Sequence, residues 1–371
     1  MKLGLERMRA QLDRLGAPDR HLGTVVHVAG TNGKGSTVAM IAAIARNAGK
    51  RVATYTSPHL SCLRERIVVT GEMASEDAIV RAADGVDPEL TFFEQITAIG
   101  LRVIADARPD ITVLEVGLGG RLDATNAVDA PIAVVTGVAM DHEAILGDTL
   151  AAIAREKAGI FKRGQHAVIG CSGEPAAVPW LVDHARAAGV ADVTLASTAA
   201  AVELVGPHQQ RNAASAVAVA NLLGLPVDLG NVRHPGRFER AGDLIFDGAH
   251  NPHGARALAD TLREQGIRPV LVIACSADKD VAAIAAALRP AVSHVVATRY
   301  QQDRAMDPDL LAQHFGGVSA PDLQTAVDAA RALGTPILVA GSLFLVGEAR
   351  VRYLGAPADP VMVSDPVARA T

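Results

Sequence analysis

The chain has 371 residues, of which 49% are hydrophobic and 20% are charged, and its net charge is −5. The length favours two domains, and the composition is that of a globular protein with a sizeable core. Acidic and basic residues are interspersed and aromatic residues make up only 3%, which argues against a nucleic-acid-binding surface.

Cysteines and apolar runs argue against secretion and against a membrane. The three cysteines, Cys62, Cys171 and Cys275, are far apart and lack metal-ligand spacing. Leucines between Leu3 and Leu15 predict an amphipathic N-terminal helix rather than a secretory segment. The longest nearly apolar stretch, 213–227, is too short to span a bilayer. We therefore expect a cytoplasmic protein.

The first part of the chain alternates short apolar runs with alanine-rich segments. The runs predict strands at 25–29, 52–56, 111–116, 132–138 and 167–170, and the segments predict helices near 38–47, 94–107, 149–158 and 211–224. This alternation predicts an α/β fold with a mainly parallel sheet covered by helices. Ligands of such sheets lie beyond the carboxyl ends of the strands.

A second α/β series follows a turn signal at Pro235-Gly236. It predicts strands at 244–246, 270–274, 294–297 and 336–340, and helices near 254–265, 280–288 and 322–333. We place the linker at 233–236, so that the domains are 1–233 and 237–371. The tail from about 355 has no periodicity, and we expect it to be poorly ordered.

The most informative stretch is a glycine-rich loop between the first predicted strand and helix. Glycines let backbone N–H groups close around phosphate oxygens at a helix N-terminus. A lysine supplies a mobile cation, and a following hydroxyl can bind magnesium. An ordinary strand-to-helix turn is the alternative. We predict nucleotide binding by Gly30, Thr31, Asn32, Gly33, Lys34, Gly35, Ser36 and Thr37.

Two polar positions end neighbouring predicted strands. Glu115 must be paired or metal-bound if it is buried, and Arg121 is an alternative partner. Asp141-His142 closes the next apolar run, although a histidine there can also be an ordinary core residue. A loop hydroxyl such as that of Ser36, together with Glu115 and His142, can surround one cation.

Two further positions allow a simpler explanation. Lys157 lies near the end of a predicted helix, where a lysine suits the helix dipole. Asp247 and His250 lie in a turn between a strand and a helix, where such residues often act only as caps.

In order along the chain, several segments resemble the folylpolyglutamate synthase/dihydrofolate synthase family, a branch of the Mur ligase superfamily. Gly35, which separates Lys34 from Ser36 and departs from a general phosphate loop, is typical of that family. The resemblance runs from the first helix to about Arg350. It is carried by 27–37, by Ser57-Pro58-His59-Leu60 with Glu65-Arg66-Ile67, and by 115–126, 141–142, 146–149, 156–160, 208–209, 212–213, 235–237, 247–252 and 341–343.

The resemblance implies an ATP-binding Mur-type central domain, with a P-loop, followed by a smaller Rossmann-like glutamate-ligase domain. It implies that Ser36, Glu115 and His142 bind magnesium, and that Lys157 is carried as a carbamate near a second magnesium ion. It assigns ATP to the glycine-rich loop with Asn212, Arg237 and Asp247. The substrate residues that it implies are Ser57, Pro58, His59, Arg66, Asp123, Lys279 and Ser342.

The implied reaction is ATP-driven addition of L-glutamate to dihydropteroate or folate through an acyl phosphate, with Lys34, His142, Lys157 and His250 as catalytic residues. The expected partners are these small molecules, and we expect a monomer. One alternative is a cell-wall Mur ligase, but only a helix and a strand precede Gly30, where those enzymes carry a UDP-binding domain. Another is a nucleotide-binding regulator without ligase activity. Segments 69–91 and 170–208 look short for the family, so the choice of pterin substrate stays open.

Overall fold

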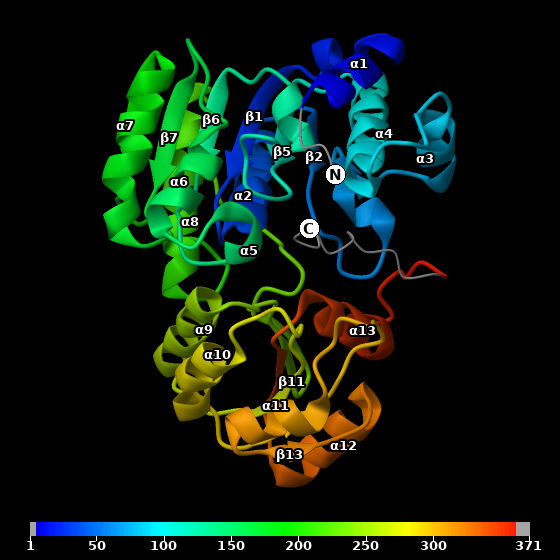
Figure 1. The fold of residues 1–371 in the computed structure, drawn as a ribbon, viewed down its shortest axis with the longest axis vertical. Coiled ribbons are helices and arrows are strands. Elements are labelled where there is room, and N and C mark those ends of the chain that lie inside the picture. The colour runs from blue at the N-terminus through cyan, green and yellow to red at the C-terminus, as the bar shows by residue number, and fades with distance from the viewer. Residues whose placement is uncertain (1–4, 361–371) are drawn as a thin grey trace.

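A computed structural model describes residues 5–360 and shows two lobes, each a sheet covered by helices (Figure 1). The helices of the first lobe are α1 (Glu6–Arg14), α2 (Lys34–Asn47), α3 (Glu76–Ala83), α4 (Phe92–Ala107), α5 (Glu143–Leu146), α6 (Leu150–Ala158), α7 (Val178–Ala188) and α8 (Pro207–Leu222). Its strands are β1 (Thr24–Ala29), β2 (Val52–Tyr55), β3 (Ile67–Val69), β4 (Glu72–Met73), β5 (Ile111–Glu115), β6 (Ile132–Val135), β7 (His166–Gly170) and β8 (Asp192–Ala196).

The second lobe is built in the same way from the later part of the chain. Its helices are α9 (Pro252–Glu264), α10 (Val281–Leu288), α11 (Pro308–Phe315), α12 (Leu323–Leu333) and α13 (Leu343–Leu354). Its strands are β9 (Glu239–Ala241), β10 (Leu244–Phe246), β11 (Val270–Ile273), β12 (Val295–Ala297), β13 (Val318–Ser319) and β14 (Ile337–Ala340).

The first sheet places the glycine-rich loop at its centre. Its strand order is β4-β3-β2-β5-β1-β6-β7-β8, and β1 pairs in parallel with β5 on one side and β6 on the other. The central strands are buried along their whole length, as apolar runs in a parallel sheet require. Loops that follow β1, β5 and β6 therefore meet at one edge of the sheet.

Local sequence explains where the main helices begin. Helix α2 starts at Lys34, directly after Gly33, whose φ of 82° lies in the left-handed region that favours glycine. Helix α4 begins with a capping box in which Thr91 and Glu94 each bond to the backbone N–H of the other. Helix α9 begins with Pro252 after Asn251, whose side chain accepts a hydrogen bond from the Gly254 N–H.

The second sheet has the order β13-β12-β11-β14-β10-β9, and only β9 runs antiparallel to its neighbour. Apolar residues of β11, β12 and β14 pack under α9 and α10 on one face, and under α12 and α13 on the other. The turn after β10 and the loop after β11 face the first lobe, because both contribute residues that bond to it.

The predicted α/β architecture is confirmed, and all nine predicted strands are present with ends shifted by at most three residues. Helices α2, α4, α8 and α9 begin two to four residues earlier than predicted. The sequence missed the strands β3, β4, β8, β9 and β13 and the helices α3, α5, α7, α11 and α13. These strands lie toward the edges of their sheets.

The predicted linker at 233–236 lies between the last helix of the first lobe and β9, and as a domain boundary it stays a prediction. Residues 355–360 have no regular structure but bond to segment 61–63, which a poorly ordered tail would not do. The rest of the tail, 361–371, lies outside the described residues. Within residues 5–360, no helix combines the length and the apolar character needed to cross a bilayer.

Candidate active site

The glycine-rich loop is packed tightly against helix α8. A Cβ at position 33 would stand 2.2 Å from Asn212 Oδ1, so glycine is required there by contact as well as by conformation. Asn212 is itself fixed, because its Oδ1 accepts a hydrogen bond from Ser172 Oγ at 2.7 Å and its Nδ2 donates to Gln209 Oε1 at 3.0 Å. The predicted ATP residue Asn212 therefore lies against the loop.

Two lysines converge on one backbone carbonyl of the loop. Lys34 Nζ donates to Gly30 O at 3.2 Å, and Lys157 Nζ donates to the same oxygen at 3.1 Å. Burial, followed by the positive charge of Lys34, lowers the pKa of Lys157 from 10.5 to about 7. The amine of Lys157 is therefore buried beside the glycine-rich loop. A favourable interaction with the dipole of its own helix does not explain this position.

Glu115 is a buried carboxylate beside the same loop. Its Oε2 accepts a hydrogen bond from the Ser57 N–H at 3.2 Å and lies 3.7 Å from the point where a Gly35 Cβ would stand. Burial raises the pKa of Glu115, and Lys34, the Ser57 N–H and Arg237 oppose that rise. Arg121, the alternative partner, instead pairs with Glu156 at 2.9 Å.

The surroundings of Glu115 fit a divalent cation. One N–H donor and the positive charges of Lys34 and Arg237 only partly offset the burial of this carboxylate, because its pKa stays raised. Two hydroxyls, that of Ser57, whose N–H contacts Glu115, and that of Thr37 in the first turn of α2, are buried with no hydrogen-bond partner in residues 5–360. Magnesium binds oxygen ligands, and carboxylates and hydroxyl groups beside a phosphate loop can supply them. Ser36, also buried at the start of α2, and Glu115 are the residues that would hold it.

No group of three or more His, Cys, Asp or Glu residues within 5–360 is arranged to hold a metal. The predicted set of Ser36, Glu115 and His142 contains only two residues of those kinds, so its convergence on one ion stays a prediction. His142 has a left-handed backbone, with a φ of 53°, and its side chain is 37% exposed. It lies beside Asp141 and not in hydrogen-bond contact with Glu115.

Asp141 is the residue that links the two lobes. Its carboxylate accepts hydrogen bonds from Lys279 Nζ at 2.7 Å and from Asn251 Nδ2 at 2.7 Å, both from the second lobe. Burial raises the pKa of Asp141, but His142, Lys279 and His250 together hold it well below its ordinary value. We did not select Asp141 from the sequence, although its position beside His142 at a strand end was the available signal.

The asparagines of the two lobes also meet. Asn251 Nδ2 donates to Asn32 Oδ1 at 3.0 Å, and Asn32 Nδ2 lies 3.0 Å from His253 Nδ1. Both Asn251 and His253 were missed as site residues, because a turn of this composition usually only caps its helix. Here Asn251 does cap α9 and in addition bonds to the glycine-rich loop.

The turn after β10 places two predicted residues, Asp247 and His250, near Arg237. Asp247 accepts hydrogen bonds from the backbone N–H groups of Phe238 at 3.0 Å and Ala249 at 2.9 Å. Burial raises the pKa of Asp247, and Arg237 opposes the rise. His250 Nδ1 lies 2.8 Å from Gly248 O, and burial lowers the pKa of His250 to about 4. His250 is therefore neutral at neutral pH.

The remaining predicted substrate residues lie in three places. Ser57, Pro58, His59 and Arg66 belong to segment 57–66, in which Pro58 is exposed and the other three are buried. Arg66 Nε donates to His59 Nδ1 at 2.9 Å. Lys279 and Ser342 lie in the second lobe, and Ser342 caps α13.

Asp123 stabilises the local backbone. Its oxygens accept hydrogen bonds from the Leu118 N–H and from the N–H and hydroxyl of Thr125. It fixes the turn that follows β5, and within the described residues it makes no hydrogen bond to another predicted site residue.

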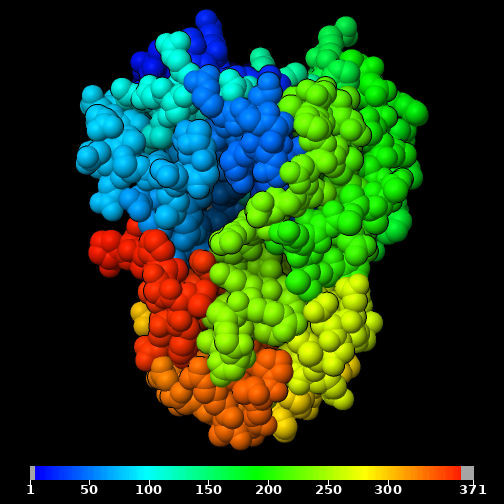
Figure 2. Space-filling model, turned by 180° about the vertical axis from the view of Figure 1, so that it is seen from behind, coloured from blue at the N-terminus to red at the C-terminus, as the bar shows by residue number. Residues whose placement is uncertain are grey.

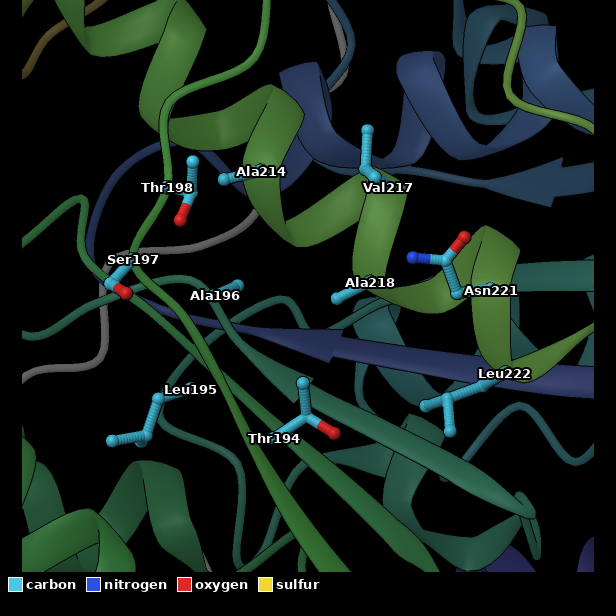
Figure 3. A pocket seen from close by; sticks show the side chains of 10 residues that line it. All are labelled: Thr194, Leu195, Ala196, Ser197, Thr198, Ala214, Val217, Ala218, Asn221 and Leu222. Carbon is cyan, nitrogen blue, oxygen red and sulfur yellow. The ribbon is translucent and has the colours of Figure 1, made fainter.

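One cavity lies away from these residues. It has a volume of about 320 Å³ and is lined by residues of β8, the loop after it and α8 (Figure 3). None of its lining residues is a predicted site residue. From α8 it is lined by Ala214, Val217 and Asn221, among others, which Figure 3 labels.

Comparison with known proteins shows which domains this chain resembles. Residues 28–177 match the Mur ligase middle domain, and residues 236–343 match the Mur ligase glutamate ligase domain. The chain is 36% identical to a dihydrofolate synthase/folylpolyglutamate synthase of Escherichia coli, and the match covers 93% of this chain and 90% of the relative. The chain belongs to the dihydrofolate synthase/folylpolyglutamate synthase family of Mur ligases.

Solved structures of this family have the same fold. A Mycobacterium tuberculosis folylpolyglutamate synthase complexed with ADP superposes with a TM-score of 0.88 at 32% identity, over 96% of this chain and 95% of that one. E. coli FolC in complex with DHPP and ADP gives a TM-score of 0.86 at 33% identity, over 96% and 94% of the two chains.

Some relatives in the family are longer. A probable bifunctional folylpolyglutamate synthase/dihydropteroate synthase of Haloferax volcanii is 36% identical over 95% of this chain. This chain spans about half the length of that relative and of its Halobacterium salinarum counterpart, with 49% and 50% of them covered.

Proposed function

We propose that this chain is an ATP-dependent carboxylate–amine ligase that adds L-glutamate to dihydropteroate, to folates or to both. The observation that carries the proposal is the contact between lobes at Asp141, which accepts hydrogen bonds from Lys279 and Asn251 of the second lobe, while Asn251 also donates to Asn32 of the glycine-rich loop. A phosphate-binding loop and a cationic amino-acid site on separate lobes match the two half-reactions of such a ligase. Crystal structures of relatives support it, since they are described with ADP and DHPP, or with Mn, AMPPNP and L-glutamate.

In the first half-reaction, the glycine-rich loop holds the triphosphate and Lys34 neutralises the charge that develops on the transferred phosphoryl group. The substrate carboxylate attacks the γ-phosphorus, ADP leaves, and an acyl phosphate forms. Magnesium, held by Ser36 and Glu115, would supply further positive charge at the phosphate oxygens.

In the second half-reaction, the amino group of glutamate attacks the acyl carbon and phosphate leaves. Lys279 and Ser342 are suited to hold the amino acid in place, since Lys279 is a largely buried cation and Ser342 lies at the N-terminus of α13. His250, neutral at neutral pH, is suited to accept the proton that the amine loses.

Lys157 is proposed to carry a carbamate. Carbamate formation requires a neutral amine, and a pKa of about 7 leaves a large neutral fraction at neutral pH. The reaction joins the lysine nitrogen to the carbon of carbon dioxide and releases one proton. The resulting anion replaces one of the two positive charges next to Gly30 and would bind a second magnesium ion.

We propose that the protein is a monomer that acts on small molecules in the cytoplasm. A regulator without ligase activity is the alternative function. Phosphate release from ATP should require both a pteroate substrate and glutamate. Products from dihydropteroate and tetrahydrofolate should gain the mass of one glutamate residue. Phosphate release that needs neither substrate, or no release with any combination, would reject the ligase.

A further inference from the structure

Segment 57–66, which precedes β3, lies between the lobes, and we call it the bridging segment. Its fold depends on Glu65, whose carboxylate accepts hydrogen bonds from the N–H groups of Leu60 at 2.7 Å, Ser61 at 3.3 Å and Cys62 at 3.2 Å. Because three consecutive N–H groups donate to the Glu65 carboxylate, the backbone at 60–62 turns tightly around it. The start of the segment reaches the candidate metal site, because the Ser57 N–H donates to Glu115.

The tip of the bridging segment packs into the second lobe. Leu60 is buried and belongs to the apolar cluster formed by β10, β11, β14 and α13. Its carbonyl approaches α13 so closely that a Cβ at Gly347 would stand 2.0 Å from Leu60 O. A side chain there would displace the backbone of one partner, so glycine at 347 permits this contact.

The last described residues hold the same segment from another side. Asp359 Oδ2 accepts a hydrogen bond from the Leu63 N–H at 2.6 Å, and Asp359 Oδ1 lies 3.4 Å from the Cys62 thiol. The Asp359 N–H donates to Ser61 O at 3.0 Å, and Ser61 Oγ donates to Pro357 O at 2.8 Å. Figure 2 shows the red C-terminal part of the chain lying against the blue part of the first lobe.

We propose that Asp359 is a positioning residue that ties the bridging segment to the second lobe and thereby orders the predicted substrate residues Ser57, His59 and Arg66 in that segment. The proposal rests on the proposed function for the identity of the substrate, but the tie itself does not. The hydrogen bonds of Asp359 join the chain after α13 to a segment whose other end contacts Glu115. Removal of these hydrogen bonds therefore increases the fraction of molecules in which the bridging segment has moved away from the residues that bury it. It does not change any residue of the glycine-rich loop.

The tie can be measured without any substrate. Cys62 is 3% exposed and Cys275 is fully buried, so alkylation of Cys62, mapped by mass spectrometry, reports opening of the segment and Cys275 reports general unfolding. Loss of a charge-assisted hydrogen bond corresponds to about a tenfold change in such an equilibrium. Asp359→Ala should therefore speed labelling of Cys62 about tenfold and leave Cys275 unchanged.

Two matched variants complete the labelling experiment. Asp359→Asn keeps an oxygen that can accept from the Leu63 N–H, so its labelling rate should stay within about twofold of the unmodified protein. Asp106→Ala removes an exposed aspartate on α4 and should change nothing. Equal labelling of Cys62 in Asp359→Ala and in the unmodified protein would overturn the proposal, as would equal acceleration at Cys62 and Cys275.

Kinetics test the consequence for the reaction. If the unmodified protein ligates glutamate, Asp359→Ala should raise KM for the pteroate substrate severalfold and leave KM for ATP unchanged, with Asp359→Asn restoring the original value. Equal rises in both KM values would overturn the positioning role. If the unmodified protein shows no ligase activity, the proposed function fails, and the labelling result still decides whether Asp359 ties the segment.

Discussion

Replacement of Lys157 by methionine should stabilise the protein while abolishing its activity. The Lys157 side chain is 4% exposed, and its pKa falls from 10.5 to about 7. Each pKa unit corresponds to about 1.4 kcal/mol, so keeping this amine buried costs about 4 kcal/mol at pH 7. Loss of its hydrogen bond to Gly30 O offsets about 1 kcal/mol. Lys157→Met should therefore raise the free energy of unfolding at pH 7 by about 3 kcal/mol.

The pH dependence has a definite sign. In the unfolded chain Lys157 keeps its proton up to about pH 10.5, whereas in the folded protein it loses the proton near pH 7. Between these values the unfolded state binds more protons. This group therefore makes the unmodified protein more stable as pH rises, by up to about 1.4 kcal/mol per pH unit. The advantage of Lys157→Met should shrink above pH 7 and disappear by about pH 9 to 10.

The assay is urea unfolding followed by circular dichroism, between pH 6.5 and 9.5, in buffer freed of carbon dioxide so that the amine stays unmodified. Lys50→Met, at an exposed lysine after α2, is the matched control and should show no pH-dependent difference. In the activity assay, Lys157→Met should lose at least about 100-fold, and Lys157→Ala should recover part of the loss with added acetate. A stability difference that stays constant from pH 7 to 9, or a less stable variant, would refute this reasoning.

Two further predictions concern the metal site and the contact between lobes. Glu115→Gln should raise the magnesium concentration needed for half-maximal turnover at least about tenfold, with an unchanged circular dichroism spectrum; an unchanged magnesium dependence would remove Glu115 from the metal site. Asp141→Ala leaves Lys279 buried without its partner and should lower the free energy of unfolding by about 3 kcal/mol. In a double-mutant cycle with Lys279→Met, the two effects should not add, and additive effects would show that the pair at 2.7 Å contributes nothing by itself.

The strands that the sequence predicted best are those with the strongest local pattern. The runs that became β1, β5, β6 and β7 are buried on both faces, so nearly every residue is apolar and the pattern is continuous. Strand β8 is partly exposed at the edge of the sheet. It therefore lacks a continuous apolar run, and its sequence did not predict a strand. An edge strand forms because it pairs with a neighbouring strand. The residues of the edge strand alone do not reveal that pairing.

The amino-acid sequence by itself determined the α/β class, the glycine-rich loop and the identity of Lys34, Glu115 and Lys157 as site candidates, because these depend on short-range pattern and on resemblance. Tertiary structure decided what surrounds each of them. Lys157 became an amine with a lowered pKa only because folding buries it beside Lys34, and Asp141 became a link only because Lys279, 138 residues away, reaches it from the other lobe. Burial and long-range charge are properties of the assembled chain, and no local run of residues specifies them.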